Sequence, residues 1–385
     1  MEHLLNQSVK QIEISGIRQF FNKVAHLEDV ISFTIGQPDF KTPDHIKDYA
    51  IQSINQNFTN YTHNAGFLEL REELSKWMES KYASHYDAES EIIVTTGASQ
   101  GIDAALRTIL SNGCEVILPG PVYPGYEPII RLAGGVPVYV DTTKTDFKLN
   151  VELLQSHVTE NTRCIILPYP SNPTGVSLTR CELEEIAEFV KGKDIFILSD
   201  EIYSELTYTG EHTSMGQLLR EQTIVINGLS KSHSMTGWRI GFIFGPKEIM
   251  KHILKVHQYN VSCASSISQK AAYEAIKNGM NDPIEMKKEY DHRRKYVLRR
   301  LKEMNLYSVE PDGAFYFFVK IPFEGITSFD FCMDVAENYK VALVPGSAFS
   351  SWGEGFFRLS YACSFEQLEA GLNRLERYMS DKKRT

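Results

Sequence analysis

The feature of this chain that most constrains its fold is a regular alternation of short apolar runs with amphipathic stretches, from about Glu91 to Gly245. Runs of this length suit strands buried on both faces, and the stretches between them have helical spacing. The runs are 92–95, 116–118, 138–140, 164–167, 195–198, 224–226 and 240–244, and the expected helices include 98–110, 126–132, 151–155 and 182–190. The pattern predicts an α/β fold with a mostly parallel sheet sandwiched by helices. Some of the last runs have no long helix between them, which leaves room for an antiparallel strand.

The chain changes character beyond about Met280. A long charged helix is expected there, followed by an α+β segment: helices 283–304 and 329–339, strands 315–319, 341–344 and 356–359, and a final helix from residue 365. A chain of 385 residues is long enough for two domains. We therefore expect a large domain over 46–280 and a smaller α+β domain formed by 1–45 together with 281–385.

Composition excludes several classes of protein. With 40 Lys and Arg against 49 Asp and Glu, the net charge is −9 and no run of like charge stands out, which argues against a nucleic-acid or membrane surface. No apolar stretch approaches the ~18–20 residues of a membrane helix, and no signal peptide is expected from the first residues. The six cysteines form no Cys-x-x-Cys pair and the histidines are dispersed, so we expect reduced thiols, a cytoplasmic location and no metal site.

One lysine, Lys231, follows closely after the apolar run 224–226, and Arg239 stands eight residues further on. A lysine at the end of a buried strand is costly unless its amine is neutralised, paired or used covalently. One covalent use is a bond to an aldehyde cofactor, and the phosphate of pyridoxal phosphate would explain Ser230 and Arg239 nearby. The alternative is a surface lysine in a loop. Against that alternative stands Asp200, which also directly follows an apolar run.

Several other polar residues follow the ends of apolar runs, where open parallel sheets bind their ligands. Gly97-Ala-Ser-Gln100 opens a helix, so the free amide groups and the Ser99 hydroxyl can hold a phosphate, although plain capping is the alternative. Arg239 can grip the same phosphate in a fork, or form a surface ion pair. Because these strand ends share one edge of the sheet, we expect the residues to converge.

The remaining residues at this edge have matching chemistry. Asp200 can hold a proton on a pyridine nitrogen, since the opposite charge stabilises a pyridinium, or it can cap a helix or pair with an arginine. Asn172 and Tyr203 can donate to the phenolic oxygen of the cofactor, and Asn172-Pro also favours a turn. Tyr123 can stack on the cofactor ring, although a tyrosine flanked by prolines also serves as loop packing.

Three motifs together are far more specific than any one of them: Ser-Lys-Ser-x-Ser-Met-Thr-Gly-Trp-Arg at 230–239, Asn-Pro-Thr-Gly at 172–175 and Asp-Glu-Ile-Tyr at 200–203. With them, nearly the whole chain resembles the fold-type-I pyridoxal-phosphate aminotransferases of the class I/II family. Within that family, the segments 222–241 and 258–266 resemble the bacterial aminotransferase A group, whose members are assigned as N-acetyl-LL-diaminopimelate aminotransferases of lysine biosynthesis.

The resemblance implies roles in binding pyridoxal 5'-phosphate. Lys231 resembles the lysine that bonds to the cofactor, and Asp200 resembles the partner of the pyridine nitrogen. Tyr203 is the third expected catalytic residue, and it and Asn172 resemble the residues that contact the phenolic oxygen of the cofactor. The positions that match the phosphate cup are Ala98, Ser99, Ser230 and Arg239, and Tyr123 falls at the ring-stacking position.

The resemblance also implies how substrate and a second subunit are bound. Arg358 matches the arginine that clamps the substrate α-carboxylate, assisted by Gly36 and Asn172. Tyr61 resembles a tyrosine that reaches a phosphate in the neighbouring subunit, which implies a homodimer with shared active sites. No motif identifies the residue that reads the substrate side chain.

The implied activity moves an amino group between an L-amino acid and 2-oxoglutarate by a ping-pong mechanism, with Lys231 as covalent anchor and general acid/base. The group resemblance points to the acetylated diaminopimelate precursor as the physiological keto acid. A broad-specificity aspartate or aromatic aminotransferase is the nearest alternative, and a carbon–sulfur β-lyase is a more distant one. A cofactor-sensing regulator would need a DNA-binding segment, for which this acidic chain has neither room nor composition. A non-catalytic binding protein would have lost Lys231 or Asp200, and the presence of both argues against that class.

Overall fold

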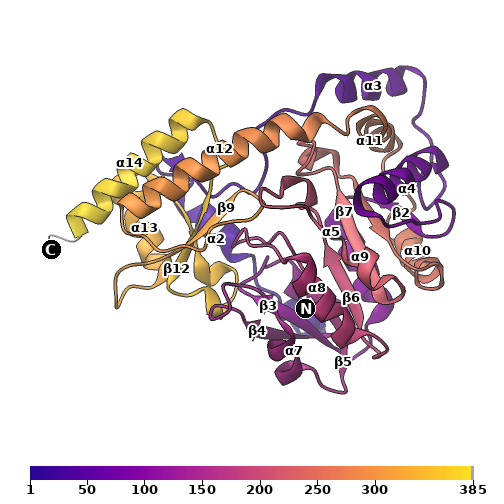
Figure 1. Ribbon diagram of the computed structural model, residues 1–385, viewed down its shortest axis with the longest axis horizontal. Coiled ribbons are helices and arrows are strands. Elements are labelled where there is room, and N and C mark those ends of the chain that lie inside the picture. Colours follow the sequence, from indigo (N-terminus) through magenta and orange to yellow (C-terminus); the bar gives the residue numbers. More distant parts are fainter. Residues whose placement is uncertain (383–385) are drawn as a thin grey trace.

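The computed structural model describes residues 1–382, and its largest sheet has seven strands (Figure 1). The strand order is β2 (Ile92–Thr95), β8 (Gly241–Phe244), β7 (Thr223–Gly228), β6 (Phe196–Asp200), β5 (Thr162–Leu167), β3 (Glu115–Gly120) and β4 (Val136–Asp141). Strand β8 is antiparallel to both of its neighbours, whereas the other pairs are parallel. The predicted mostly parallel sheet is therefore confirmed, and the antiparallel part is the last of the predicted runs.

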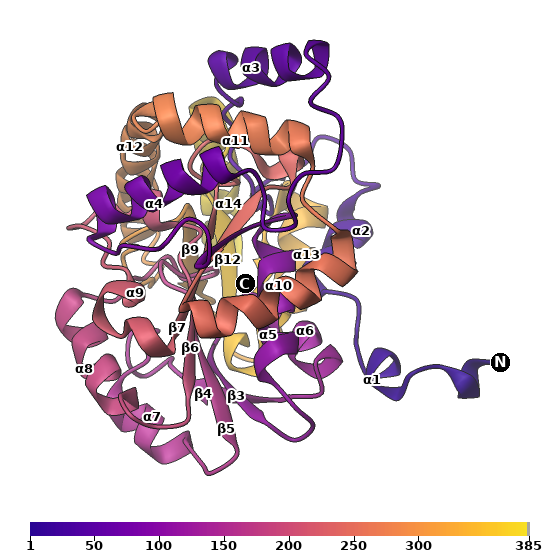
Figure 2. The same cartoon turned by 90° about the vertical axis from the view of Figure 1, so that its right-hand side faces the viewer.

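Helices cover both faces of this sheet, as Figure 2 shows with the strands between two helical layers. One face carries α5 (Ala98–Ile109), α6 (Tyr126–Leu132) and α10 (Lys247–Val261). The other carries α7 (Val151–His157), α8 (Arg180–Val190), α9 (Met215–Leu218), α4 (Leu68–Tyr82) and α11 (Ser266–Asn278), with α3 (Asp44–Asn55) packed on α11. Alternation along β5 explains the two layers, because Cys164 and Ile166 enter one core while Ile165 enters the other.

The sequence accounts for the position of these helices. In α8, the residues Leu183, Ile186, Ala187 and Val190 form the buried stripe at spacings of three and four. Thr179 begins that helix with a capping box, because its hydroxyl accepts from the Glu182 amide and the Glu182 carboxylate accepts from the Thr179 amide. The predicted helix 182–190 is therefore two residues too short at its start.

A second group of elements combines the two ends of the chain. Strands β11 (Val344–Pro345), β12 (Phe356–Ser360) and β9 (Tyr316–Lys320) form an antiparallel sheet, and β1 (Ile31–Ser32) pairs in parallel with β10 (Val341–Ala342). The helices around them are α2 (Gly16–Val24), α12 (Asp282–Glu303), α13 (Ser328–Tyr339) and α14 (Phe365–Lys382). The prediction of a single strand over 341–344 is wrong. The segment is interrupted at Leu343, and its two halves, β10 and β11, pair with β1 and β12 respectively.

The short elements complete the chain. They are α1 (Gln7–Lys10) and the 3-10 helices η1 (Glu2–Leu4), η2 (Ser204–Leu206), η3 (Arg220–Gln222), η4 (Thr236–Trp238), η5 (Gly346–Ala348) and η6 (Ser351–Gly353). Across residues 1–382, the longest apolar helical stretches fall short of what is needed to cross a membrane.

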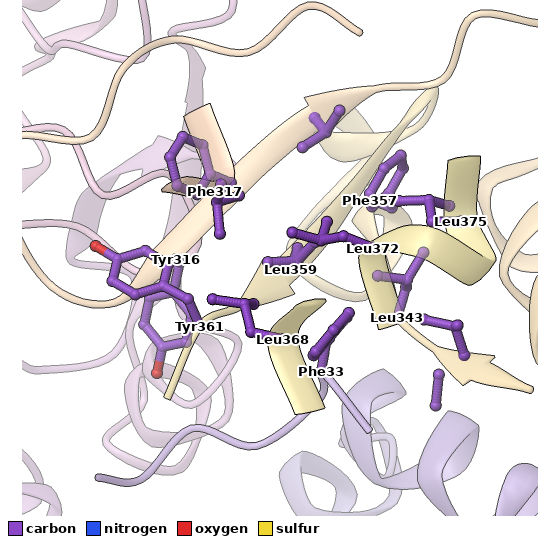
Figure 3. Close-up of a cluster of buried hydrophobic side chains, with 14 of the residues drawn as sticks. Phe33, Tyr316, Phe317, Leu343, Phe357, Leu359, Tyr361, Leu368, Leu372 and Leu375 are labelled. Atoms are coloured by element: carbon purple, nitrogen blue, oxygen red, sulfur yellow. The ribbon is translucent and has the colours of Figure 1, made fainter. Parts of the chain in front are cut away.

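Figure 3 shows the apolar cluster in which the two ends of the chain meet. Phe33 from the N-terminal segment contacts a core that includes Leu359 of β12 and Leu372 of α14, and all three are fully buried. Gly371 is required beside them, because a Cβ there would come within 2.3 Å of the Phe33 ring. The division into a domain over 46–280 and another from 1–45 and 281–385 stays a prediction.

We expect Leu372→Ala to lower the free energy of unfolding by about 2–5 kcal/mol, because it leaves a cavity in a close-packed core. The measurement is urea unfolding followed by circular dichroism. Leu4→Ala is the control, since Leu4 is 68% exposed, and it should change the free energy by less than about 0.5 kcal/mol. Equal effects of the two substitutions would contradict this description of the core.

Candidate active site

A cavity of about 430 Å³ opens where the parallel strands of the large sheet end and the second sheet begins. The carboxyl ends of parallel strands lie along one edge, so residues far apart in sequence meet there. Of the residues singled out from the sequence, those that line the cavity are Gly36, Ala98, Ser99, Tyr123, Asn172, Asp200, Tyr203, Ser230, Lys231, Arg239 and Arg358. Tyr61 does not, because it lies 88% exposed in a separate hollow beside residues 263–267.

One end of the cavity is shaped for a phosphate. Helix α5 begins there without a side-chain cap, so the amides of its first turn are free to bind an anion. Its N-cap residue, Gly97, has φ +80°, and a Cβ on it would come within 2.3 Å of the Arg239 guanidinium. A Cβ on Gly241 would meet the Ala98 amide nitrogen at 2.5 Å. The two glycines thus let an arginine and a strand approach the start of the helix.

Asp200 lies at the end of β6 and is 7% exposed. The Tyr126 hydroxyl donates to its Oδ2 at 2.6 Å, and the Ile202 amide donates to its Oδ1 at 3.2 Å. Burial raises the pKa of this carboxyl, while the Tyr126 bond opposes the increase. Among the described residues no cation contacts this carboxylate directly, which suits it to hold a protonated nitrogen.

Lys231 extends into the cavity, where its Nζ donates to the Gly36 carbonyl oxygen at 2.6 Å. Burial lowers the pKa of the amine to about 8, and the positive charge of Arg358 acts in the same direction. Asp200 partly offsets both effects. At pH 7 roughly a tenth of such an amine is neutral, far more than for an ordinary lysine, and the neutral form is the one that attacks aldehydes and accepts protons.

Arg358 of β12 is 1% exposed and, within residues 1–382, contacts no carboxylate. Its Nη1 donates to Asn172 Oδ1 at 2.8 Å and its Nη2 to the Thr34 carbonyl oxygen at 2.7 Å. Its buried Nε has no hydrogen-bond partner. Burial lowers the pKa of the guanidinium. An uncompensated buried cation of this kind is a site for an anion, and a guanidinium binds carboxylates in a planar fork.

Two residues of the site were missed by the sequence reasoning. Tyr126 was assigned only to a helix, yet it holds Asp200. Tyr316 was assigned only to a strand, yet its hydroxyl lies 2.9 Å from that of Tyr203 and its ring lies under Arg358. A sequence signal existed for Tyr316, because a tyrosine inside the apolar strand 315–319 needs a partner for its buried hydroxyl.

The residues present fit pyridoxal phosphate. The helix start with Arg239 and Ser230 suits the phosphate, Lys231 is an amine poised for the aldehyde, and Asp200 suits the ring nitrogen. Arg358 is not part of the phosphate end of the cavity, so it remains available to bind a second anion.

Comparisons with known proteins agree with this geometry. The family model described as aminotransferase class I and II matches residues 28–375. A Bacillus subtilis protein named "probable N-acetyl-LL-diaminopimelate aminotransferase" is 62% identical, covering 100% of this chain and 98% of that one. An aspartate aminotransferase of Pyrococcus abyssi is 42% identical over 96% of this chain and 97% of its own. The crystal structure of an aromatic aminotransferase from Pyrococcus horikoshii superposes with a TM-score of 0.90 at 42% identity, covering 94% of this chain and 99% of that one. The chain therefore belongs to the aminotransferase class I and II family and is a pyridoxal-phosphate-dependent aminotransferase.

Proposed function

We propose that this enzyme is an N-acetyl-LL-diaminopimelate aminotransferase of lysine biosynthesis, which exchanges an amino group with 2-oxoglutarate by a ping-pong mechanism. The observation that supports an α-amino acid substrate is the buried Arg358 without an anionic partner, which suits an α-carboxylate. The 62% identity to a Bacillus protein with that name supports the choice of substrate. A broad-specificity aspartate or aromatic aminotransferase is the second candidate, since relatives with those names match over nearly the whole chain.

We assign the binding roles as follows. Bound pyridoxal phosphate supplies an aldehyde that accepts the amino group and a ring that takes up the electrons of the α-carbon. The first turn of α5 at Ala98 and Ser99, with Ser230 and Arg239, holds the phosphate, and Tyr123 stacks on the ring.

Asp200 holds the proton on the ring nitrogen, while Asn172 and Tyr203 donate to the phenolic oxygen. Arg358 binds the substrate α-carboxylate, with Gly36 and Asn172 beside it.

Lys231 carries the proton transfers in this proposal. Its Nζ anchors the cofactor when no substrate is bound, and after release it takes the proton from the α-carbon. The pKa of about 8 suits both tasks, because the amine gains and loses a proton near the working pH. The neighbouring cation Arg358 contributes to that pKa, so the carboxylate site and the base are electrostatically linked.

We further propose a homodimer with shared active sites that works in the cytoplasm. The stretch from α3 to the first residue of α4 exposes a group of apolar side chains, and α3 projects at the top of Figure 2. Ile51, Ile54, Phe58 and Leu68 are each more than one-third exposed, close in sequence to Tyr61. Exposed apolar groups of this kind are typical of subunit interfaces. The six free cysteines suit a reducing compartment.

The substrate proposal is tested by following the absorbance of the bound cofactor during titration with L-glutamate, L-aspartate, L-phenylalanine, L-cystathionine and N-acetyl-LL-diaminopimelate. We expect glutamate and the acetylated donor to change the spectrum and 2-oxoglutarate to restore it. The kcat/KM for the acetylated donor should exceed that for aspartate by about tenfold or more, because extra contacts discriminate by ~1–3 kcal/mol. A preference for aspartate or phenylalanine would favour the second candidate. Pyruvate release from cystathionine without a keto acid would favour a β-lyase.

The dimer proposal predicts a solution mass of twice the 43.8 kDa of one chain by light scattering. Tyr61→Phe should weaken cofactor affinity about tenfold, since it removes a hydrogen bond to a charged phosphate. Tyr259→Phe is the matched control, because Tyr259 is equally exposed at 88%, and it should leave the affinity unchanged. A monomer, or a Tyr61→Phe enzyme with normal affinity, would exclude the shared site.

A further inference from the structure

Tyr316 lies between two of the proposed functional residues. It is fully buried on β9, its hydroxyl oxygen lies 2.9 Å from that of Tyr203, and the Arg358 guanidinium carbon lies 4.4 Å from its ring centroid. Figure 3 shows Tyr316 at the rim of the apolar cluster, with its hydroxyl directed away from the labelled leucines. The ring therefore packs with the core and the hydroxyl faces the cavity, which Tyr316 also lines.

The register of the second sheet places Tyr316 beside Arg358. In the antiparallel pair of β9 and β12, Arg358 is opposite Phe318 and Ser360 is opposite Tyr316. Residues directly opposite share a face, and so do residues two apart along a strand, so Arg358 and Tyr316 are diagonal neighbours on one face. Tyr203, in contrast, follows β6 of the large sheet. The contact between the two hydroxyls thus joins the two sheets inside the cavity.

Packing alone does not require the hydroxyl of Tyr316. Its neighbours Phe317 and Phe318 fill the same strand without one, and a phenylalanine would preserve the contact of the ring with Arg358. The hydroxyl also lies close to the backbone at Gly36, where an added Cβ would come within 3.1 Å of it. The hydroxyl therefore has a task beyond filling the core.

Hydrogen-bond counting indicates that task. Each phenol has one proton to donate, so if Tyr203 donates to a cofactor oxygen and the bond between the two hydroxyls is kept, Tyr316 must be the donor of that bond. Hydrogen bonds in such a chain polarise one another, which makes Tyr203 a stronger donor. Burial raises the pKa of Tyr316, and the charge of Arg358 acts against that increase. A carboxylate that neutralises Arg358 would weaken this effect of its charge.

We infer that Tyr316 is a positioning residue that couples the carboxylate site at Arg358 to the hydroxyl of Tyr203. The inference rests on the proposed roles of those two residues. The ring packs against the face of the Arg358 guanidinium, and the hydroxyl orients the proton of Tyr203 toward the cofactor. Through Tyr316, binding of a substrate carboxylate to Arg358 thereby affects the hydrogen bond that Tyr203 donates to the cofactor.

Two substitutions separate the ring from the hydroxyl. Tyr316→Phe keeps the ring, so kcat should fall about fivefold while KM for 2-oxoglutarate stays unchanged. Tyr316→Leu removes the ring, so KM should rise about tenfold. Calorimetry of 2-oxoglutarate binding to the cofactor-free protein should show the same tenfold loss for Tyr316→Leu and none for Tyr316→Phe. Tyr361→Phe is the control: Tyr361 is equally buried in the same cluster, and its hydroxyl donates to a backbone carbonyl.

A double-mutant cycle tests the link to Tyr203. In a Tyr203→Phe background, Tyr316→Phe should cause no further loss of kcat, because its proton then has no functional partner. An equal fivefold loss in both backgrounds would overturn the inference, and so would a Tyr316→Phe enzyme that matches Tyr361→Phe. If Tyr316→Leu fails to fold, the Tyr316→Phe cycle alone decides. Absence of transamination in the unsubstituted enzyme would instead contradict the proposed function.

Discussion

The active site depends on positive charge held inside a pocket with little negative charge to balance it. Within residues 1–382, the lining of the cavity includes Lys231, Arg239 and Arg358 but a single carboxylate, that of Asp200. Arg358 is the fully buried member of this group, and a buried charge without an ionic partner costs several kcal/mol, a cost that a bound carboxylate relieves. Burial lowers the pKa of Lys231, and the charges of Arg358 and Arg239 lower it further. The cations that suit anion binding therefore also help to set the acid–base chemistry of the amine.

The fold supplies this arrangement by bringing together groups from two sheets. Asp200 and Lys231 follow parallel strands of the large sheet, whereas Arg358 comes from β12 of the second sheet. Glycines at 97 and 241 allow the close approach of α5, β8 and Arg239, which a side chain at either position would prevent. The hydroxyl pair of Tyr203 and Tyr316 then connects the sheets at the point where cofactor and substrate sites meet. In the proposed assignment, Tyr316 therefore contacts both the residue for the substrate carboxylate and a residue for the cofactor.

Much of this could be predicted from the sequence, for a definite physical reason. Strands buried on both faces leave long apolar runs, and the ends of parallel strands share an edge, so Asn172, Asp200 and Lys231 could be placed together from spacing alone. Arg358 could not, because it belongs to a sheet whose position relative to the first has no periodic signature. Tyr126 and Tyr316 were missed since their roles depend on where a hydroxyl points. The break of 341–344 into two strands depends on tertiary pairing with both ends of the chain.

The central claim is that burial, together with the charge of Arg358, lowers the pKa of Lys231 to about 8, and a direct measurement of that pKa tests it. The measurement is a pH titration of the cofactor-free protein with ¹³C-labelled lysine, in which the Cε resonance of Lys231 is assigned by its loss in Lys231→Arg. We predict a midpoint near pH 8, with the protonated form below it and the neutral form above it. In Arg358→Gln the midpoint should move upward, since one repelling charge is gone. A midpoint near 10.5, the usual value for lysine, that does not respond to Arg358→Gln would contradict the account.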